Sequence, residues 1–418
     1  MNNRVELLAP AGNLEKLKIA LTYGADAVYG GVSHFSLRIR SGKEFTYESF
    51  EEGIKYAHKL GKKVYVTING FPFNNQLKLL EKHIERMRDL NPDAFIVSTP
   101  GVIKLSKKVA PNIPLHLSTQ ANVLNYLDAE VFYEMGVSRI IAAREISLRD
   151  LEEIKKRLPD LEIEIFVHGS MCFAYSGRCL ISSLQSGRVP NRGSCANDCR
   201  FPYTLYAENE ESGVMMKIEE DENGTFIMNA KDLNLSMHLD EILKSGVVDS
   251  LKIEGRTKSP YYVGITTKVY KEAIEDYYAG RFDPDKYYKE LLTTKHRGFT
   301  DGYLVHRPYE KLNTQKLDSS ISDGEKQVYA LIDESGEYFF AKDKVEPNIE
   351  YEIVIPVGKE IKECSNDIGS IYKKEDRYFI KLNKIETKNG KILTAVHSGN
   401  TNPIKLPCKL PSYTFFRK

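Results

Sequence analysis

The chain has no tryptophan and only six cysteines, and its positive and negative side chains almost cancel. Its 59 lysine and arginine residues against 58 aspartate and glutamate residues give a net charge of +1, which favours no class of charged partner. It also has no run of 18 apolar residues, so no membrane span and no membrane partner are expected. With 418 residues, of which 41% are hydrophobic, two or three domains with a sizeable core are expected.

The N-terminal segment MNNRVELLAPAGN lacks the basic region and the apolar stretch of a secretory signal. A cytoplasmic location is therefore expected, where thiols stay reduced and disulfides are rare. Cys364 and Cys408 lie far from the other cysteines in the sequence. We expect these two to be small buried apolar residues or exposed thiols rather than ligands.

The other four cysteines fall within a single stretch of 28 residues. They are Cys172, Cys179, Cys195 and Cys199, with the spacing C-x6-C-x15-C-x3-C. Four soft thiolates are the usual ligand set of an iron–sulfur cluster or of structural zinc. Structural zinc usually takes two close pairs, and only the second pair is close here. The spacing therefore favours a cluster slightly and leaves zinc as an alternative.

Eight short apolar runs alternate with amphipathic stretches through the first 260 residues. Most runs are rich in β-branched residues and bounded by Gly, Pro or Asn, a pattern typical of buried parallel strands. Eight β/α units in order predict an α/β fold of the TIM-like (β/α)8 barrel type, with an open doubly wound sheet as the alternative. The runs are VELLAPAG, DAVYGGV, KVYVTIN, AFIVST, PLHLSTQANV, SRIIAARE, EIEIFVHG and SLKIEG.

The pattern along the chain predicts a catalytic domain over residues 1–285 that includes a cysteine-rich segment, residues 172–199. The stretches FPYTLYAE, GVMMKIEED and GTFIMNA are typical of short antiparallel strands, so a β insertion is expected at about 201–230. Residues 286–325 are predicted to form a linker region. Residues 326–418 alternate apolar and polar positions between charged turns, which predicts a small C-terminal antiparallel β-barrel domain.

Polar residues inside or just after the runs are candidates for catalysis, because the active site of a (β/α)8 barrel lies at the C-terminal ends of its strands. Taken singly, each has a structural explanation as a residue that caps a strand or lines the barrel. Taken together, they are expected to lie with the cysteines at the same end of the barrel. The candidate catalytic residues are His116, Gln120, Arg144, Glu145, His168, Glu254 and Arg256.

Arginine is concentrated around the cysteines although the whole chain is nearly neutral. This concentration predicts a cationic mouth for an anion, either a small carboxylate or a phosphate backbone, with scattered solvated charge as the alternative. The arginines are Arg144, Arg178, Arg188, Arg192, Arg200 and Arg256.

Ordinary hydrolase motifs are missing, since the chain has no HExxH and no G-x-S-x-G. A thiol peptidase built from Cys172 and the nearby His168 is conceivable. That arrangement would leave the other three clustered cysteines unexplained.

The residues around the first two clustered cysteines resemble the signature of the collagenase-like peptidase family U32. EIFVHGSMC at 164–172 is followed, after four residues, by GRCLIS at 177–182. The resemblance covers essentially the whole chain. Other segments similar to that family are ELLAPAGN and YGADAVYGG near the N-terminus, HLSTQ at 116–120, NAKDL at 229–233 and KIEGR at 252–256.

The resemblance implies more than the family name says, because the better-understood members are iron–sulfur proteins that hydroxylate RNA bases or a quinone ring. The branch of this length comprises prephenate-dependent tRNA uridine hydroxylases, which make 5-hydroxyuridine at the wobble position. It implies a 4Fe–4S cluster on the four clustered cysteines, with three ligands and an open iron as a variant. Its implied partners are tRNA and a small anionic metabolite, with an oligomer or a paralogous partner left open. A peptidase and a zinc-stabilised binding protein are the alternatives.

Overall fold

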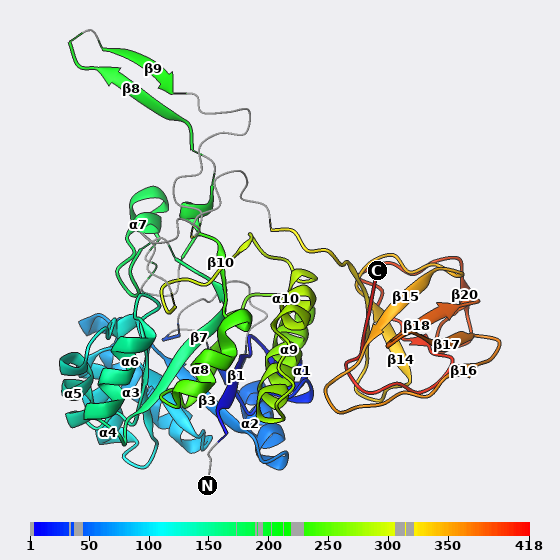
Figure 1. The fold of residues 1–418 in the computed structure, drawn as a ribbon, viewed down its shortest axis with the longest axis horizontal. Helices are drawn as coiled ribbons and strands as arrows, with labels where there is room; N and C mark the ends of the chain where they lie inside the picture. The colour runs from blue at the N-terminus through cyan, green and yellow to red at the C-terminus, as the bar shows by residue number, and fades with distance from the viewer. Residues whose placement is uncertain are drawn as a thin grey trace.

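The structure is a computed structural model in which a barrel with surrounding helices lies beside a separate C-terminal sheet (Figure 1). The two parts are the barrel domain, up to residue 305, and the C-terminal domain, from residue 322. The residues that the structure describes are 4–32, 35–36, 45–172, 174–188, 190, 195–201, 203–211, 213–218, 230–305, 314 and 322–418.

Eight parallel strands form a closed barrel, as the sequence predicts. Strands β1 to β7 pair in chain order, and β11 pairs with both β7 and β1, so the sheet closes on itself. This closure excludes the open doubly wound sheet. Seven of these strands lie within their apolar runs, and β7 extends one residue beyond its run, to Ser170. The strands are β1 (Glu6–Pro10), β2 (Ala27–Gly30), β3 (Lys63–Ile68), β4 (Ala94–Val97), β5 (Leu115–Leu117), β6 (Arg139–Ile141), β7 (Glu162–Ser170) and β11 (Ser250–Ile253).

Six of the eight helices named here begin at a residue whose side chain caps them. The Thr46 side chain, for example, accepts a hydrogen bond from the Ser49 backbone at the start of α2, and Gly61 with φ 67° ends the turn that follows this helix. A left-handed backbone at this position is most accessible to glycine. The helices are α1 (Leu14–Thr22), α2 (Tyr47–Lys59), α3 (Leu77–Asp89), α4 (Pro100–Val109), α5 (Tyr126–Glu134), α6 (Leu148–Arg157), α8 (Leu239–Ser245) and α9 (Pro260–Tyr278).

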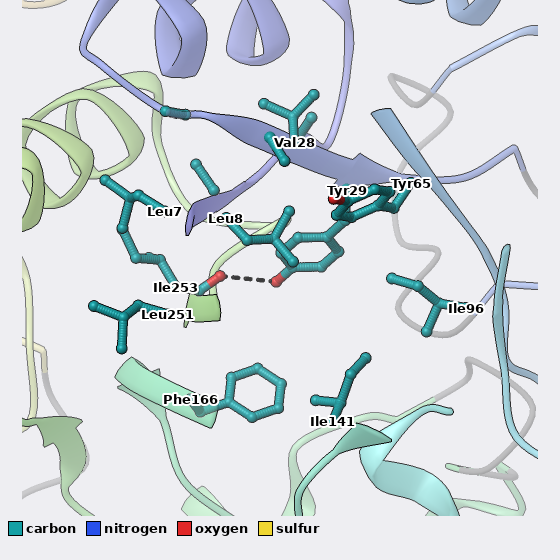
Figure 2. Packing of buried hydrophobic residues seen from close by; sticks show 14 of the residues in the cluster. Leu7, Leu8, Val28, Tyr29, Tyr65, Ile96, Ile141, Phe166, Leu251 and Ile253 are labelled. Atoms are coloured by element: carbon teal, nitrogen blue, oxygen red, sulfur yellow. Dashed lines mark hydrogen bonds between the residues drawn. The ribbon is translucent and has the colours of Figure 1, made fainter. Parts of the chain in front are cut away.

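The inside of the barrel combines an apolar core with one layer of buried charge. Figure 2 shows the apolar residues, and the hydroxyl of Tyr29 donates to the carbonyl of Ile253 across the interior at 2.9 Å. Deeper in the barrel, Arg139 donates to Glu6 at 2.6 Å and to Glu164 at 3.2 Å. These pairs satisfy charges that would be costly to bury alone.

Additional elements extend the barrel sheet beyond its eight strands. Strand β10 (Asp232–Asn234) pairs antiparallel with β7, and β12 (Phe299–Thr300) pairs parallel with β10. Helix α10 (Pro284–Leu292) and β12 occupy much of the first half of the predicted linker, 286–325, so that part packs on the barrel. Residues 306–313 and 315–321 of the predicted linker lie outside the described residues.

The predicted insertion contains an antiparallel hairpin of β8 (Leu205–Asn209) and β9 (Val214–Ile218). The hairpin extends away from the barrel (Figure 1). Residues 219–229 of the predicted insertion lie outside the described residues. A short helix, α7 (Ile181–Ser186), lies within the cysteine-rich segment.

The C-terminal domain is an eight-stranded antiparallel sheet, which agrees with the predicted β architecture in the form of a half-barrel. Within residues 322–418 its pairing order is β16-β17-β18-β15-β22-β13-β14-β21, which has two ends. The last strand of the chain therefore lies in the middle of the sheet. The strands are β13 (Val328–Ile332), β14 (Tyr338–Ala341), β15 (Glu350–Val354), β16 (Cys364–Ser365), β17 (Gly369–Lys374), β18 (Arg377–Leu382), β21 (Ile404–Lys405) and β22 (Phe415–Arg417).

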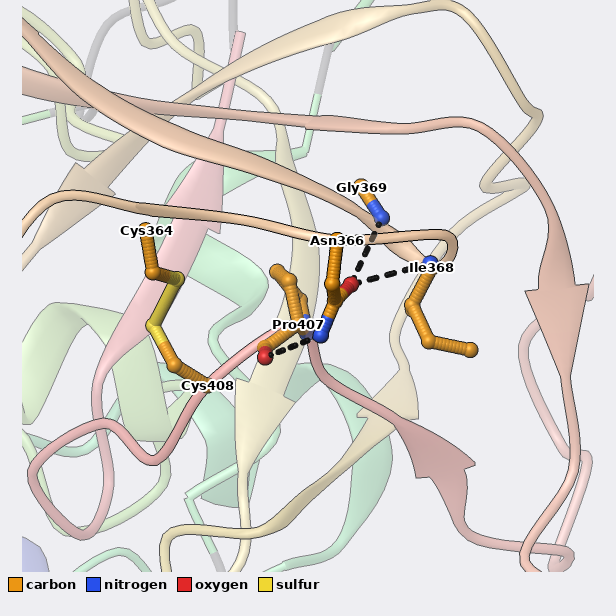
Figure 3. The surroundings of a disulfide bond; sticks show 6 residues. All are labelled: Cys364, Asn366, Ile368, Gly369, Pro407 and Cys408. Carbon is orange, nitrogen blue, oxygen red and sulfur yellow. Dashed lines mark hydrogen bonds between the residues drawn. A yellow bond between two sulfur atoms is a disulfide. The ribbon is translucent and has the colours of Figure 1, made fainter.

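Cys364 and Cys408 form a disulfide in this domain (Figure 3). The prediction that they are apolar residues or exposed thiols was wrong. They are 44 positions apart in sequence, yet the fold brings their Cα atoms to 6.6 Å. Nearby, the amide of Asn366 donates to the carbonyl of Pro407 at 2.7 Å, which holds the two segments together.

A buried arginine joins the two domains. Arg417 donates both to Glu352 of the C-terminal domain and to Glu290 of α10, and its side chain is only 2% exposed. Burial alone would raise the pKa of Glu352, but the hydrogen bond and charge of Arg417 hold that pKa below its usual value. Tyr23, which directly follows α1, donates hydrogen bonds to the carbonyls of Val354 and Tyr413.

Replacing Arg417 should strongly lower the free energy of unfolding. Arg417→Met would leave Glu290 without its arginine and Glu352 with only the more exposed Arg377, and breaking a buried ion pair costs about 3–5 kcal/mol. Urea unfolding monitored by circular dichroism would measure the loss. Lys55→Met, which removes an exposed pair with Glu51, is the control and should change stability by less than about 1 kcal/mol. Equal effects of the two variants would contradict a buried junction.

Candidate functional site

Two adjoining cavities lie at the C-terminal ends of the barrel strands. The larger, of about 150 Å³, is the cysteine pocket, and the smaller, of about 40 Å³, is the barrel-mouth pocket. Gln120 and Arg144 line both cavities and so connect them. The cysteine pocket is lined by Gln120, Arg144, Glu145, Ser170, Met171, Cys172, Ala174, Tyr175, Ser176, Gly177, Cys179, Ile181, Pro190, Cys195, Asn197, Cys199, Arg200, Thr257 and Lys258.

The loop between the first two clustered cysteines is held against the ends of β5 and β6. Glu145 accepts hydrogen bonds from the backbone N–H of Ser176 at 3.0 Å and from its hydroxyl at 3.1 Å. Gly177 has φ 74° and lies so close to Gln120 that an added Cβ would be 2.3 Å from its carbonyl oxygen. Only glycine fits this contact.

The second pair of cysteines is held against α7. The hydroxyl of Ser182 accepts from the backbone of Ala196 at 3.1 Å, and Ser186 donates to Asp198 at 3.3 Å. Tyr203 donates to the carbonyl of Asp198 at 2.6 Å. These bonds fix the short turn around Cys199 and bring it to the same pocket as the first pair.

All four clustered cysteines line this one pocket, as the sequence predicts, and none of them is in a disulfide. Burial raises the pKa of the Cys179 thiol, and the charges of Cys172 and Cys195 raise it further. Burial also raises the pKa of Cys199, and the other three thiols add to this shift although Arg200 opposes it. Four thiolates crowded together are stable only with a positive partner such as a metal.

The donor set of the cysteine pocket suits a metal group that takes thiolates. Four cysteines line the pocket, and thiolates are ligands both of iron–sulfur clusters and of structural zinc. Among the described residues, no three Cys, His, Asp or Glu side chains are grouped so as to hold one ion. By ligand type the four thiols therefore fit either group.

The barrel-mouth pocket is cationic. The guanidinium of Arg144 lies 3.8 Å from the centre of the Phe166 ring and 3.9 Å from a carboxylate oxygen of Glu254. Arg256 donates to the hydroxyls of Ser36 at 2.6 Å and Thr67 at 3.1 Å. The pocket is lined by Tyr29, Thr67, Asn69, Ile96, Ser118, Thr119, Gln120, Ile141, Arg144, Phe166, Lys252, Glu254 and Arg256.

Five of the seven candidate catalytic residues thus meet at these cavities, and the two histidines do not. His116 is buried inside the barrel against the ring of Tyr65, and His168 is buried among Tyr262, Tyr270 and Phe299. Neither histidine is among the residues that line the two pockets.

A bulge in β7 explains the place of His168. Glu164 and Phe166 of β7 oppose Ser250 and Lys252 of β11, but the next pair is His168 with Ile253. Val167 is therefore an extra residue, which reverses the alternation of side chains beyond it. Nothing in the run EIEIFVHG marks this register shift.

The predicted arginine mouth forms in part. Arg144 and Arg200 line the cysteine pocket and Arg256 lines the barrel-mouth pocket, whereas Arg178 and Arg188 are exposed outside both. Arg192 lies outside the described residues.

Sequence reasoning missed Lys258, Thr257 and Ser176 as pocket residues. Thr257 and Lys258 directly follow the segment KIEGR at 252–256, so extending the search past the strand end would have found them. Lys258 lies 4.0 Å from Asp232, and burial lowers its pKa although Asp232 opposes the shift.

Comparison with known proteins agrees with these features. Residues 12–314 match the family described as Peptidase family U32. The chain belongs to this family. It is a homologue of tRNA hydroxylation protein P of Helicobacter pylori strain J99, at 62% identity over 99% of both chains. The Escherichia coli protein of the same name is 40% identical over 77% of this chain and 79% of its own.

A solved structure of a U32 peptidase aligns over 61% of this chain and 95% of its own, at 13% identity and a TM-score of 0.41. Within the described parts of this U32 family member, no helix combines the length and the apolar character needed to cross a membrane.

The histidine buried in β7 should make the protein sensitive to acid. Burial lowers the pKa of His168 to about 3, so between pH 6.5 and 3 only the unfolded state binds this proton. The contribution of His168 to the free energy of unfolding has its full value above pH 6.5 and falls by about 1.4 kcal/mol per pH unit below it. For His168→Phe, the free energy of unfolding measured with urea at pH 7, 6 and 5 should depend less steeply on pH than in the wild type, by about that amount per pH unit. An unchanged slope would contradict a neutral buried ring.

Proposed function

We propose that this protein is an iron–sulfur enzyme that hydroxylates uridine in tRNA, forming 5-hydroxyuridine at the wobble position with prephenate as co-substrate. The observation that carries the proposal is the meeting of four thiols with a cationic cavity at the mouth of the barrel. The printed name of the relatives, tRNA hydroxylation protein P, supports tRNA as the substrate.

The four clustered cysteines would hold a 4Fe–4S cluster. A cluster of this kind supplies one-electron redox chemistry that no amino-acid side chain of the pocket offers. Four thiols at one pocket and membership of the U32 family support such a metal group, and the uneven spacing C-x6-C-x15-C-x3-C favours a cluster over zinc. The clamp between Glu145 and Ser176 would hold the first two ligands in place.

The barrel-mouth pocket would bind the carboxylates of prephenate, which is a dicarboxylate. Arg256 and Arg144 offer planar guanidinium groups that match a carboxylate, and Lys252 adds a third positive charge. Lys252 is itself held by Glu164 at 2.7 Å, and Arg256 by Ser36 and Thr67, so these cations are preorganised. The shared residues Gln120 and Arg144 would place such an anion beside the cysteine pocket.

A peptidase, which the family name suggests, is supported less well. The Cys172 thiol lines the cysteine pocket, but the His168 ring that would activate it is enclosed by three aromatic rings outside that pocket. The pair therefore lacks the contact between nucleophile and base that thiol catalysis needs.

Removing one thiol should remove the cluster and the modification together. Cys199→Ser, purified without oxygen, should lose the brown colour and the bound iron and sulfide of the wild-type protein. In a deletion strain this variant should fail to restore 5-hydroxyuridine-type nucleosides, measured by mass spectrometry of digested tRNA. Cys408→Ser is the control and should keep the cluster. A colourless wild-type protein with stoichiometric zinc would overturn the cluster, and unchanged nucleosides in the deletion strain would overturn the tRNA assignment.

Removing one cation of the barrel-mouth pocket should weaken prephenate binding. Hydrogen bonds to charged groups contribute about 1.5–3 kcal/mol, so Arg256→Met should raise the KM for prephenate about 10- to 150-fold. The KM for tRNA and the iron content should stay near wild type. Arg157→Met, which removes an exposed arginine of α6, is the matched control. An unchanged KM for prephenate in Arg256→Met would place the co-substrate elsewhere.

A further inference from the structure

An exposed aromatic ring lies at the rim of the cysteine pocket. Tyr175 lines this pocket, and 59% of its surface remains open to solvent. It belongs to the loop between Cys172 and Cys179, and all three residues line the same pocket. An exposed aromatic ring at the wall of a polar pocket is available to stack on a flat partner bound there.

The backbone around this ring is fixed although the ring is exposed. The next residue, Ser176, gives both of its donors to Glu145, and Gly177 lies against the carbonyl of Gln120. The N–H of Arg178 donates to the carbonyl of Tyr175 at 3.0 Å and closes the turn. The ring is therefore presented from a rigid support, which lowers the entropy cost of binding a flat partner.

One buried amide oxygen lies in the same cavity. The Oε1 atom of Gln120 is buried and has no hydrogen-bond partner within the described part of the chain, and Gln120 lines both pockets. A buried polar atom of this kind needs a partner, and a ligand can supply one. The side-chain amide offers an acceptor and a donor side by side, which is the complement of a pyrimidine edge with its ring N–H and adjacent carbonyl.

The remaining charges of the cysteine pocket suit a phosphate. Arg144, Arg200 and Lys258 line it, and Glu145 is the one carboxylate among the described lining residues. Both oxygens of Glu145 already accept hydrogen bonds from Ser176. The pocket thus offers a flat ring, an amide edge and cations together, which are the parts needed for one nucleotide.

We propose that Tyr175 and Gln120 form a nucleobase subsite, in which Tyr175 stacks on the face of the target pyrimidine and Gln120 hydrogen-bonds its edge. The inference rests on the proposed function and assigns two residues to the binding of its substrate. Stacking on Tyr175 requires a base whose face is free, which fits the unpaired wobble nucleotide of the proposed function. Tyr175 is a positioning residue for tRNA, and its loss acts on binding rather than on the cluster.

The absence of tryptophan from the chain allows a direct test of stacking. Tyr175→Trp places a single indole in the cluster-loaded protein, and its emission should be quenched by tRNA and by single-stranded oligouridylate but not by duplex RNA of the same length. Tyr206→Trp is the matched control, because Tyr206 is 54% exposed on β8 and lies outside the pocket. Equally strong quenching in the Tyr206→Trp and Tyr175→Trp variants, or no quenching of the Tyr175→Trp indole by bound tRNA, would overturn the subsite.

Kinetics of the cluster-loaded enzyme separate stacking from a structural role. Stacking on one base predicts that Tyr175→Ala raises the KM for tRNA about 5- to 150-fold, while Tyr175→Phe and Tyr206→Ala stay near wild type. Gln120→Met, which keeps the side-chain length without the amide, should also raise this KM. Iron content and the KM for prephenate should not change in Tyr175→Ala.

These outcomes distinguish failure of the nucleobase subsite from failure of the proposed function. A wild-type enzyme that modifies tRNA while Tyr175→Ala keeps a normal KM for tRNA overturns the subsite alone. A loss of iron in Tyr175→Ala that Tyr175→Phe does not repair shows a structural role and also overturns it. A wild-type enzyme that neither binds nor modifies tRNA overturns the proposed function, and the subsite falls with it.

Discussion

Closure of the barrel is the constraint on which the rest of the structure depends. Strand β11 pairs with β1 on one side and β7 on the other, although β1 and β11 are separated by most of the barrel domain. This pairing brings the ends of eight strands to one mouth. Residues as distant in sequence as Thr67, Gln120 and Arg256 thereby line one small cavity. Without closure, the cations that characterise this cavity would lie along an open edge.

The cysteine loop depends in turn on the mouth that closure creates. Glu145 follows β6 and holds Ser176, while the turn that follows β5 places Gln120 against Gly177. The loop carries two thiols on one side of these contacts and the exposed ring of Tyr175 beside them. A redox centre, an anion pocket and a flat binding surface would thus be supported by the same few hydrogen bonds. Such sharing would couple the positions of two substrates to the position of the thiols.

Much of this fold could be predicted, because the pattern that identifies each strand lies within a few neighbouring residues. The eight runs, the hairpin near residue 210 and the β-rich tail all follow from patterns within a few residues. Long-range pairing was not predictable in the same way. The disulfide between Cys364 and Cys408 spans 44 positions, and helix α10 lies where the charged sequence indicated a linker. The bulge at Val167, which turns His168 away from the mouth, leaves no local trace.

The sequence alone determined the number and order of the β/α units and the identity of the four thiols. Hydrophobic periodicity and ligand chemistry are properties of short segments, so no fold is needed to see them. Only the tertiary structure decided which candidates share a cavity. Gln120, Arg144, Glu145, Glu254 and Arg256 do so, and His116 and His168 do not. The direction of a side chain depends on strand register and on contacts between distant loops, and these exist only once the chain has closed on itself.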